Sequence, residues 1–82
     1  MTDLDWLEEV NDKITRVCIR WPDAYEILKN IKHPVMVALR FEQVSEEELR
    51  RIKGMLTAAM VNYQEFEEDL SPTLSKMSQL DG

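Results

Sequence analysis

Apolar residues recur along the C-terminal half of the chain at alternating spacings of three and four. These positions, called here the heptad seam, are Leu49, Ile52, Leu56, Ala59, Tyr63, Phe66 and Leu70, with Met60 beside them. This is the a/d pattern of a helix that lies against another helix. Ser45 and Glu48 have the spacing of a capping box, and Ser71-Pro72 ends the pattern. One long helix is therefore predicted from residue 45 to residue 70.

A second apolar stripe with the same spacing opens the chain. Its members are Leu7, Val10, Ile14, Val17 and Trp21. Thr2 or Asp3 can cap the first backbone N–H groups of this helix, and Asp5 suits a capping box with Thr2. Pro22 ends it, because the residue before a proline avoids helical angles. The stripe predicts a helix over most of residues 2–21.

The segment between these helices is less clear. One apolar face formed by Ala24, Ile27, Leu28 and Ile31 predicts a short helix that ends near Lys32 or His33, before Pro34. Residues 35–41 alternate like a strand, but every other segment has a helical pattern, so a strand there would lack a partner within the chain. A second short helix over 35–41 is favoured, and a strand paired across a dimer is the alternative.

These elements predict an all-α fold, a small helical bundle of two longer and two short helices. The chain has 82 residues, which is enough for one domain. Residues 1–72 are expected to form that single helical domain, and residues 73–82 a flexible C-terminal tail. A chain this short buries only about 60–65% of its unfolded surface, so its core is small.

The central part of the long helix is apolar on more than one side. Gly54, Ala58 and Val61 lie opposite the heptad seam, which favours burial of both faces, unless Val61 is simply a single exposed valine. Charges on this helix are divided: Arg50, Arg51 and Lys53 lie near its start, and Glu65, Glu67, Glu68 and Asp69 near its end.

Acidic residues in the last turn of a helix oppose its dipole. A second copy running antiparallel would place its basic residues beside them, twice by symmetry. A homodimer that pairs through the heptad seam is therefore predicted. The alternative is that the acidic end is solvated, or meets Arg16 and Arg20 of the same chain.

Composition narrows the function. The chain has 44% hydrophobic residues and a net charge of -6, from sixteen acidic and ten basic residues. This charge argues against sequence-independent nucleic-acid binding and fits either a basic protein partner or simple solubility. With a single cysteine and no apparent signal peptide or membrane-spanning run, a cytoplasmic protein is expected.

Candidate chemistry is sparse. Cys18 and His33 are the only residues of their types, and nothing in the sequence brings them together or adds ligands to them. The two glycines, Gly54 and Gly82, cannot build a phosphate-binding loop. We expect no enzyme activity, no cofactor and no metal site.

The function that these features favour is a non-catalytic, small acidic interaction or regulatory protein. It would act as an inhibitor or adaptor that presents Glu65, Glu67, Glu68 and Asp69 to a basic protein surface. The alternative is a dimeric helical DNA-binding transcriptional regulator that brings together the basic residues of two chains. Trp6 is either an exposed anchor for the partner or a cover for the end of the bundle.

Overall fold

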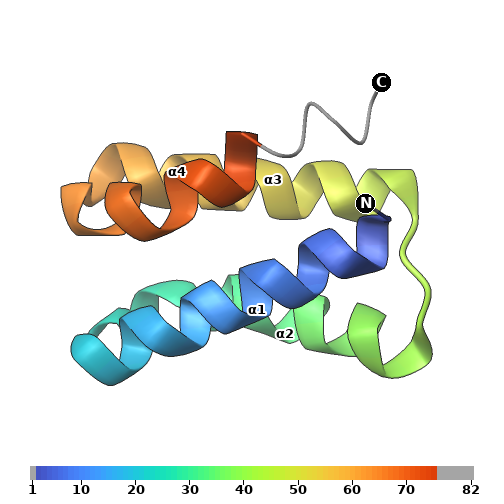
Figure 1. The fold of residues 1–82 in the computed structure, drawn as a ribbon, viewed down its shortest axis with the longest axis horizontal. Coiled ribbons are helices and arrows are strands. Elements are labelled where there is room, and N and C mark those ends of the chain that lie inside the picture. The colour runs from blue at the N-terminus through green and yellow to red at the C-terminus, as the bar shows by residue number, and fades with distance from the viewer. Residues whose placement is uncertain (1, 76–82) are drawn as a thin grey trace.

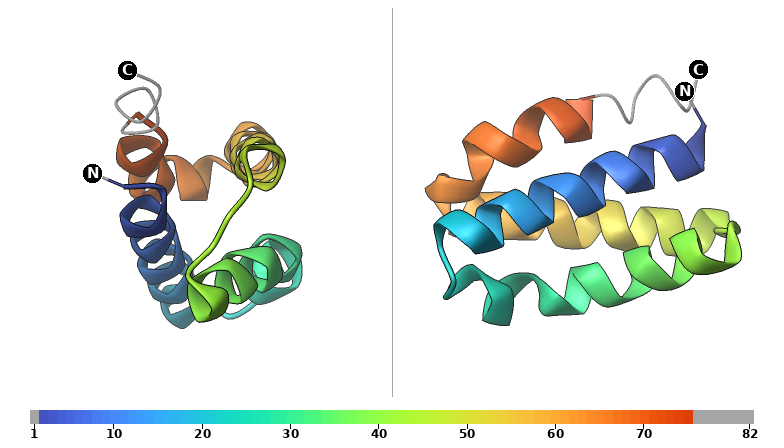
Figure 2. Two further views of the ribbon diagram at one scale, coloured as in Figure 1. Left: turned by 90° about the vertical axis from the view of Figure 1, so that its right-hand side faces the viewer. Right: turned by 60° about the horizontal axis from the view of Figure 1, so that its bottom comes forward.

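The computed structural model describes residues 2–75, which form an antiparallel bundle of α-helices (Figure 1). In chain order the elements are α1 (Asp3–Arg20), α2 (Ala24–Phe41), α3 (Glu46–Asn62), the 3-10 helix η1 (Gln64–Phe66) and α4 (Glu67–Ser75). Seen end on, the four α-helices occupy the corners of a quadrilateral, and α4 packs beside both α3 and α1 (Figure 2). The predicted all-α helical bundle is confirmed.

Helix α1 begins and ends where the sequence predicts. The Thr2 hydroxyl accepts a hydrogen bond from the Asp5 backbone N–H at 3.2 Å, and the Asp5 carboxylate accepts one from the Thr2 N–H at 3.3 Å. The helix ends at Arg20, just before Trp21-Pro22. Leu7, Val10, Ile14 and Val17 of its apolar stripe are fully buried, and Trp21, which follows the helix, is partly buried.

The prediction of two short helices between residues 24 and 41 is wrong, and so is the alternative of a strand over residues 35–41. Helix α2 continues through Pro34 to Phe41 as one helix of 18 residues. Its buried stripe keeps helical spacing across the proline: Ala24, Leu28, Ile31, Val35 and Ala38. Proline lacks the N–H that would bond to the carbonyl of Asn30, so the helix loses one hydrogen bond at that turn. Burial of Val35 and Ala38 beyond the proline offsets this loss.

Pro34 therefore costs α2 stability, and Pro34→Ala is expected to raise the free energy of unfolding by about 1–3 kcal/mol. The substitution restores a backbone N–H that can donate to the Asn30 carbonyl and removes the clash of the ring. Urea denaturation followed by circular dichroism measures the change. Pro22→Ala is the matched control, because Pro22 lies in the turn before α2, where no helical bond is missing. An equal gain in both variants, or a loss in Pro34→Ala, contradicts the expectation.

The C-terminal half also departs from the predicted single helix over residues 45–70. The Ser45 hydroxyl caps α3 by accepting from the Glu48 N–H at 3.2 Å, which is one of the two hydrogen bonds of the predicted capping box. The helix, however, ends at Asn62, and Tyr63 is extended with φ -135° and ψ 103°. The chain then turns through η1 and returns as α4, antiparallel to α3 (Figure 1).

The physical reason for this reversal is the packing of residues after Tyr63 onto α1. Phe66 is fully buried, with its ring centroid 5.5 Å from Trp21 and 5.4 Å from Tyr63. A straight helix to residue 70 would carry Phe66 and Leu70 away from α1. The turn brings both into the core instead, so burial of this apolar area favours the reversal.

Two polar contacts hold α4 against α1. The Trp6 indole N–H donates to the Thr73 carbonyl at 2.7 Å in the buried interior, and Arg20 pairs with Asp69. Thr73 is fully buried, and α4 continues through Pro72 to Ser75, so Ser71-Pro72 does not end the helix as predicted. The rest of the predicted tail, residues 76–82, lies outside the described residues.

Candidate partner-binding surfaces

Most of the heptad seam lies in the core of a single chain. Leu49, Ile52, Leu56 and Ala59 face inward from α3, Phe66 from η1 and Leu70 from α4. Met60 is partly buried at the edge of this core, and Tyr63 is 36% exposed. Their neighbours are the other helices of the same chain, so in this fold the buried members of the seam are not available to a second copy.

The predicted acidic partner surface does not lie in the last turn of a long helix. Glu65 lies in η1, and the other three residues lie at the start of α4. Glu67, Glu68 and Asp69 form the first turn of α4, where carboxylates complement the dipole. Asp69 pairs with Arg20, which is one of the two intramolecular partners that the sequence suggested. The unfavourable dipole that motivated an antiparallel dimer through the seam is therefore absent from this fold.

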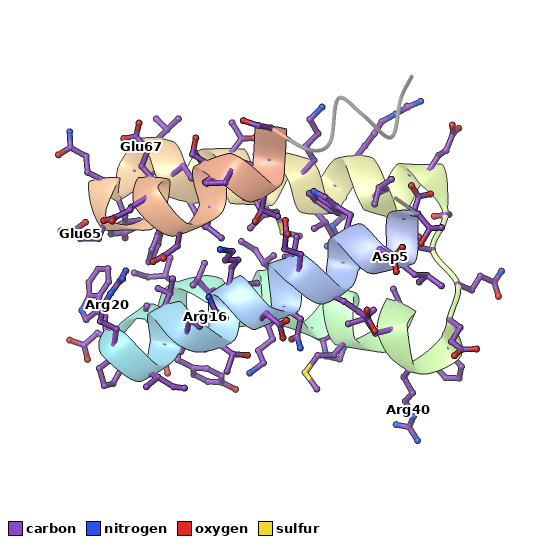
Figure 3. The ribbon with its side chains drawn as sticks, in the orientation of Figure 1. Asp5, Arg16, Arg20, Arg40, Glu65 and Glu67 are labelled. Atoms are coloured by element: carbon purple, nitrogen blue, oxygen red, sulfur yellow. The ribbon has the colours of Figure 1, made fainter. Side chains whose placement is uncertain are left out.

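Three carboxylates in η1 and the first turn of α4 are exposed: Glu65, Glu67 and Glu68. Among residues 2–75, no ion pair joins any of them to a cation. Figure 3 shows Glu65 at the end of the bundle and Glu67 on the side of the bundle opposite α1. Glu67 and Glu68 line an open hollow with Gln64, Ser71 and Pro72. We call Glu65, Glu67 and Glu68 the acidic face.

A second candidate surface is the groove between α2 and α3, on the side of the bundle away from α1 and α4 (Figure 2). Three adjoining hollows of about 600, 300 and 240 Å³ form it. The central hollow shares Val37 and Glu48 with one neighbour, and Asn30 and Met55 with the other. The groove is therefore continuous along most of the length of both helices.

Apolar and polar side chains share the lining of this groove. Val37 and Phe41 contribute from the last turns of α2, Ile27 from its first, and Met55 and Ala58 from α3. Phe41 is 69% exposed, and Arg40 lies over its ring at 6.0 Å. The polar and charged residues of the lining are Asn30, His33, Gln43, Ser45, Glu48, Arg51 and Asn62.

Of the predicted second apolar face of α3, Ala58 lines this groove, and Gly54 and Val61 lie outside its lining. Gly54 and Ala58 are exposed, and Val61 is 78% exposed. A Cβ added to Gly54 would meet no atom within 4 Å. The single chain therefore leaves this face exposed. This agrees with the alternative prediction of an exposed Val61 and not with burial of both faces of the helix within one chain.

The other residues singled out in the sequence do not form a common site. Trp6 is fully buried against α4, which makes it a cover of the core and not an exposed anchor. Cys18 is a half-buried free thiol, and His33 is exposed. Arg50 and Arg51 are exposed on α3, directly after the three glutamates of its first turn. Residues 2–75 contain no group of three or more His, Cys, Asp or Glu side chains placed to hold a metal ion.

The groove residues of α2 were not predicted as a site. Val37 and Phe41 are four residues apart, which is one helical face, but the alternation of residues 35–41 obscured that face. Once α2 is continuous through Pro34, the buried stripe accounts for Val35 and Ala38 and leaves Val37 and Phe41 outside.

Comparison with known proteins adds no relative: no family model, curated protein or solved structure matches this chain. None of the helices in the described part of the chain is both long enough and apolar enough to cross a membrane.

Proposed function

We propose that this protein is a non-catalytic interaction protein that binds a basic surface of another protein and so acts as an inhibitor or adaptor. The observation that carries the proposal is the acidic face, in which Glu65, Glu67 and Glu68 lie exposed without an ion-pair partner among residues 2–75. Exposed carboxylates accept charge-assisted hydrogen bonds from lysine and arginine side chains.

The rest of the charge distribution supports the same kind of partner. The chain carries a net charge of -6, which attracts a basic partner over a distance and raises the rate of association. Gln64 and Ser71, beside the two glutamates in the hollow, supply neutral hydrogen-bonding groups that add to recognition. Asp69 is engaged with Arg20, so it holds α4 in place and is left out of the proposed contact.

The test neutralises the acidic face without changing its shape. In the triple variant Glu65→Gln, Glu67→Gln, Glu68→Gln, we expect a basic partner captured from the native host to be lost. The matched control is Glu46→Gln, Glu47→Gln, Glu48→Gln, which removes the same three charges from the first turn of α3. The control has the same net charge as the test variant, so it separates a local contact from a general electrostatic effect.

The captured proteins are identified by mass spectrometry, and the affinity of each is then measured with purified components at several salt concentrations. We expect about tenfold or more weaker binding in the acidic-face variant alone, and a decrease with salt in the wild type. Equal binding by wild type and acidic-face variant, or equal loss in both triple variants, contradicts the assignment of this surface.

A further inference from the structure

We propose that α4 exchanges between two copies of this chain, so that α4 of each copy packs against α1 of the other in a two-fold symmetric, domain-swapped dimer. The exchange straightens the chain at Tyr63 and joins α3, η1 and α4 into one helix. We call this the open form, and the folded-back chain described above the closed form. The proposal uses neither the acidic face nor the groove between α2 and α3.

Tyr63 is the hinge of this exchange. Between residues 46 and 75 it is the one residue outside a helix, with φ -135° and ψ 103°. No glycine or proline lies between Gly54 and Pro72, so no residue near the hinge resists helical angles. Rotation at Tyr63, with a change of η1 from 3-10 to α geometry, is therefore enough to make the helix continuous.

The apolar spacing suits the open form as well as the closed one. Ala59, Tyr63, Phe66 and Leu70 follow one another at spacings of four, three and four, so they share one face of a continuous helix. In the closed form Phe66 and Leu70 are already fully buried, with Phe66 against Trp21. Both forms turn the same residues inward, and only the copy that supplies α1 differs.

A second copy supplies every contact that straightening removes. In a lone open chain, the apolar side of α4 and the side of α1 that it covers would both lie in water. In the dimer, the hydrogen bond from the Trp6 indole to the Thr73 carbonyl and the Arg20–Asp69 ion pair re-form between chains. The dimer repeats the contacts of the single chain, so it requires no additional apolar surface.

The arrangement of the helices permits this exchange. Helix α4 lies beside α3 and antiparallel to it (Figure 1). A continuous helix over residues 46–75 would be about 45 Å long at ~1.5 Å per residue. The bundle is 31 Å long, so α4 would extend beyond its own bundle and lie antiparallel to α3 of the second copy. The two bundles then meet end to end, with both hinges at the two-fold axis.

The backbone at the hinge favours the open form. Side chains of Thr2 and Ser45 cap α1 and α3, but no side-chain hydrogen bond caps the start of η1 after Tyr63. A helix end leaves N–H and carbonyl groups without partners inside the helix. A continuous helix pairs these groups across the hinge, so opening restores backbone hydrogen bonds.

Charge favours the closed form. Glu67, Glu68 and Asp69 complement the dipole at the start of α4, and this advantage is lost in the middle of a long helix. In the dimer Glu65, Glu67 and Glu68 of both copies come close to the two-fold axis, where they repel one another. We therefore expect a monomer at micromolar concentration, and more dimer as the salt concentration rises.

The test begins with wild type refolded from urea at millimolar concentration. Part of it should sediment at twice the 9.7 kDa of one chain, and this species should return to monomer slowly on dilution, because α4 must leave its place. In a dimer refolded from isotope-labelled and unlabelled chains, filtered nuclear Overhauser effects should join the Trp6 indole of one chain to Thr73 of the other.

Gln64→Pro removes the open form and keeps the closed one. Gln64 is the first residue of η1, where proline is tolerated, and a proline there keeps Tyr63 extended, as it already is. In a continuous helix the same proline would lie in the interior, so we expect about 100-fold or more weaker dimerisation. The monomer should keep its helical circular dichroism.

Glu46→Pro is the matched control. Glu46 is the first residue of α3 and follows the extended Ser45, so the substitution has the same local geometry away from the hinge. We expect it to dimerise as the wild type does.

Three results would overturn the proposal. One is a wild type that remains monomeric after refolding at millimolar concentration. Another is a dimer in which the contacts between Trp6 and Thr73 stay within one chain, because association then uses an outer surface. The last is a Gln64→Pro variant that dimerises as well as wild type and Glu46→Pro, because the chain then does not straighten at Tyr63.

Discussion

Trp6→Ala is expected to lower the free energy of unfolding by about 3–5 kcal/mol. Trp6 is fully buried, so its removal leaves a cavity between α1 and α4. Small domains have a total stability of about 5–15 kcal/mol, so this variant should be partly unfolded at moderate temperature. Urea denaturation monitored by circular dichroism measures the loss.

The conservative variant Trp6→Phe separates packing from hydrogen bonding. It keeps an aromatic ring but removes the indole N–H, and the Thr73 carbonyl is then left without its 2.7 Å partner in the interior. An unsatisfied buried carbonyl costs about 1–3 kcal/mol. Trp21→Phe is the matched control, because Trp21 is half buried in a ring cluster and a phenylalanine keeps most of its contacts. Equal losses in the two variants would count against the bond between Trp6 and α4.

Phe66→Ala is expected to lower the free energy of unfolding by a similar amount, also about 3–5 kcal/mol. Its ring is fully buried in the turn between α3 and α4, and it contacts both Trp21 and Tyr63. Removal of this ring weakens the packing that sends the chain back toward α1. Aromatic pairs of this geometry also contribute beyond their buried area.

Tyr63→Ala serves as the comparison for Phe66→Ala. Tyr63 belongs to the same cluster but is 36% exposed, so its truncation should cost clearly less. The measurement is again the midpoint and slope of urea denaturation for both variants. A Tyr63→Ala variant that is as unstable as Phe66→Ala would show that the turn does not depend on burial of Phe66.

The sequence predicted the parts of the fold that local patterns determine. The caps at Thr2 and Ser45, the stop before Pro22 and the inward face of α1 all follow from short-range spacing. The continuity of α2 does not, because a proline normally ends a helix, although the spacing from Ile31 to Val35 and Ala38 is helical throughout. In this case packing of the apolar face outweighs the lost hydrogen bond.

The break after Asn62 was missed because the heptad spacing continues across it. Tyr63, Phe66 and Leu70 keep the three-four pattern, and neither glycine nor proline marks the turn. A different signal was present. Glu67, Glu68 and Asp69 repeat the acidic triplet at the start of α3, and acidic residues favour the first turn of a helix. That similarity would have placed a helix start at residue 67.

The candidate surfaces were predictable to different degrees. Exposure of the acidic residues follows from their charge, but the pairing of Asp69 with Arg20 depends on the reversal of the chain. The groove depends on how α2 and α3 are oriented in the bundle. The sequence predicted a break at Pro34 within α2 and placed the end of α3 too late. Gly54, Ala58 and Val61 were recognised as an apolar face, and the structure adds that one chain leaves this face open.

The second half of the chain folds back, so that most of its apolar pattern is buried within one molecule. Nuclear Overhauser effects from the Trp6 indole proton test it most directly, because this proton bonds to the Thr73 carbonyl. We expect contacts from the indole to α4 at Thr73 and Leu70, and an interruption of helical contacts at Tyr63. Unbroken helical contacts from residue 46 to residue 70, with none between Trp6 and Thr73, would contradict it.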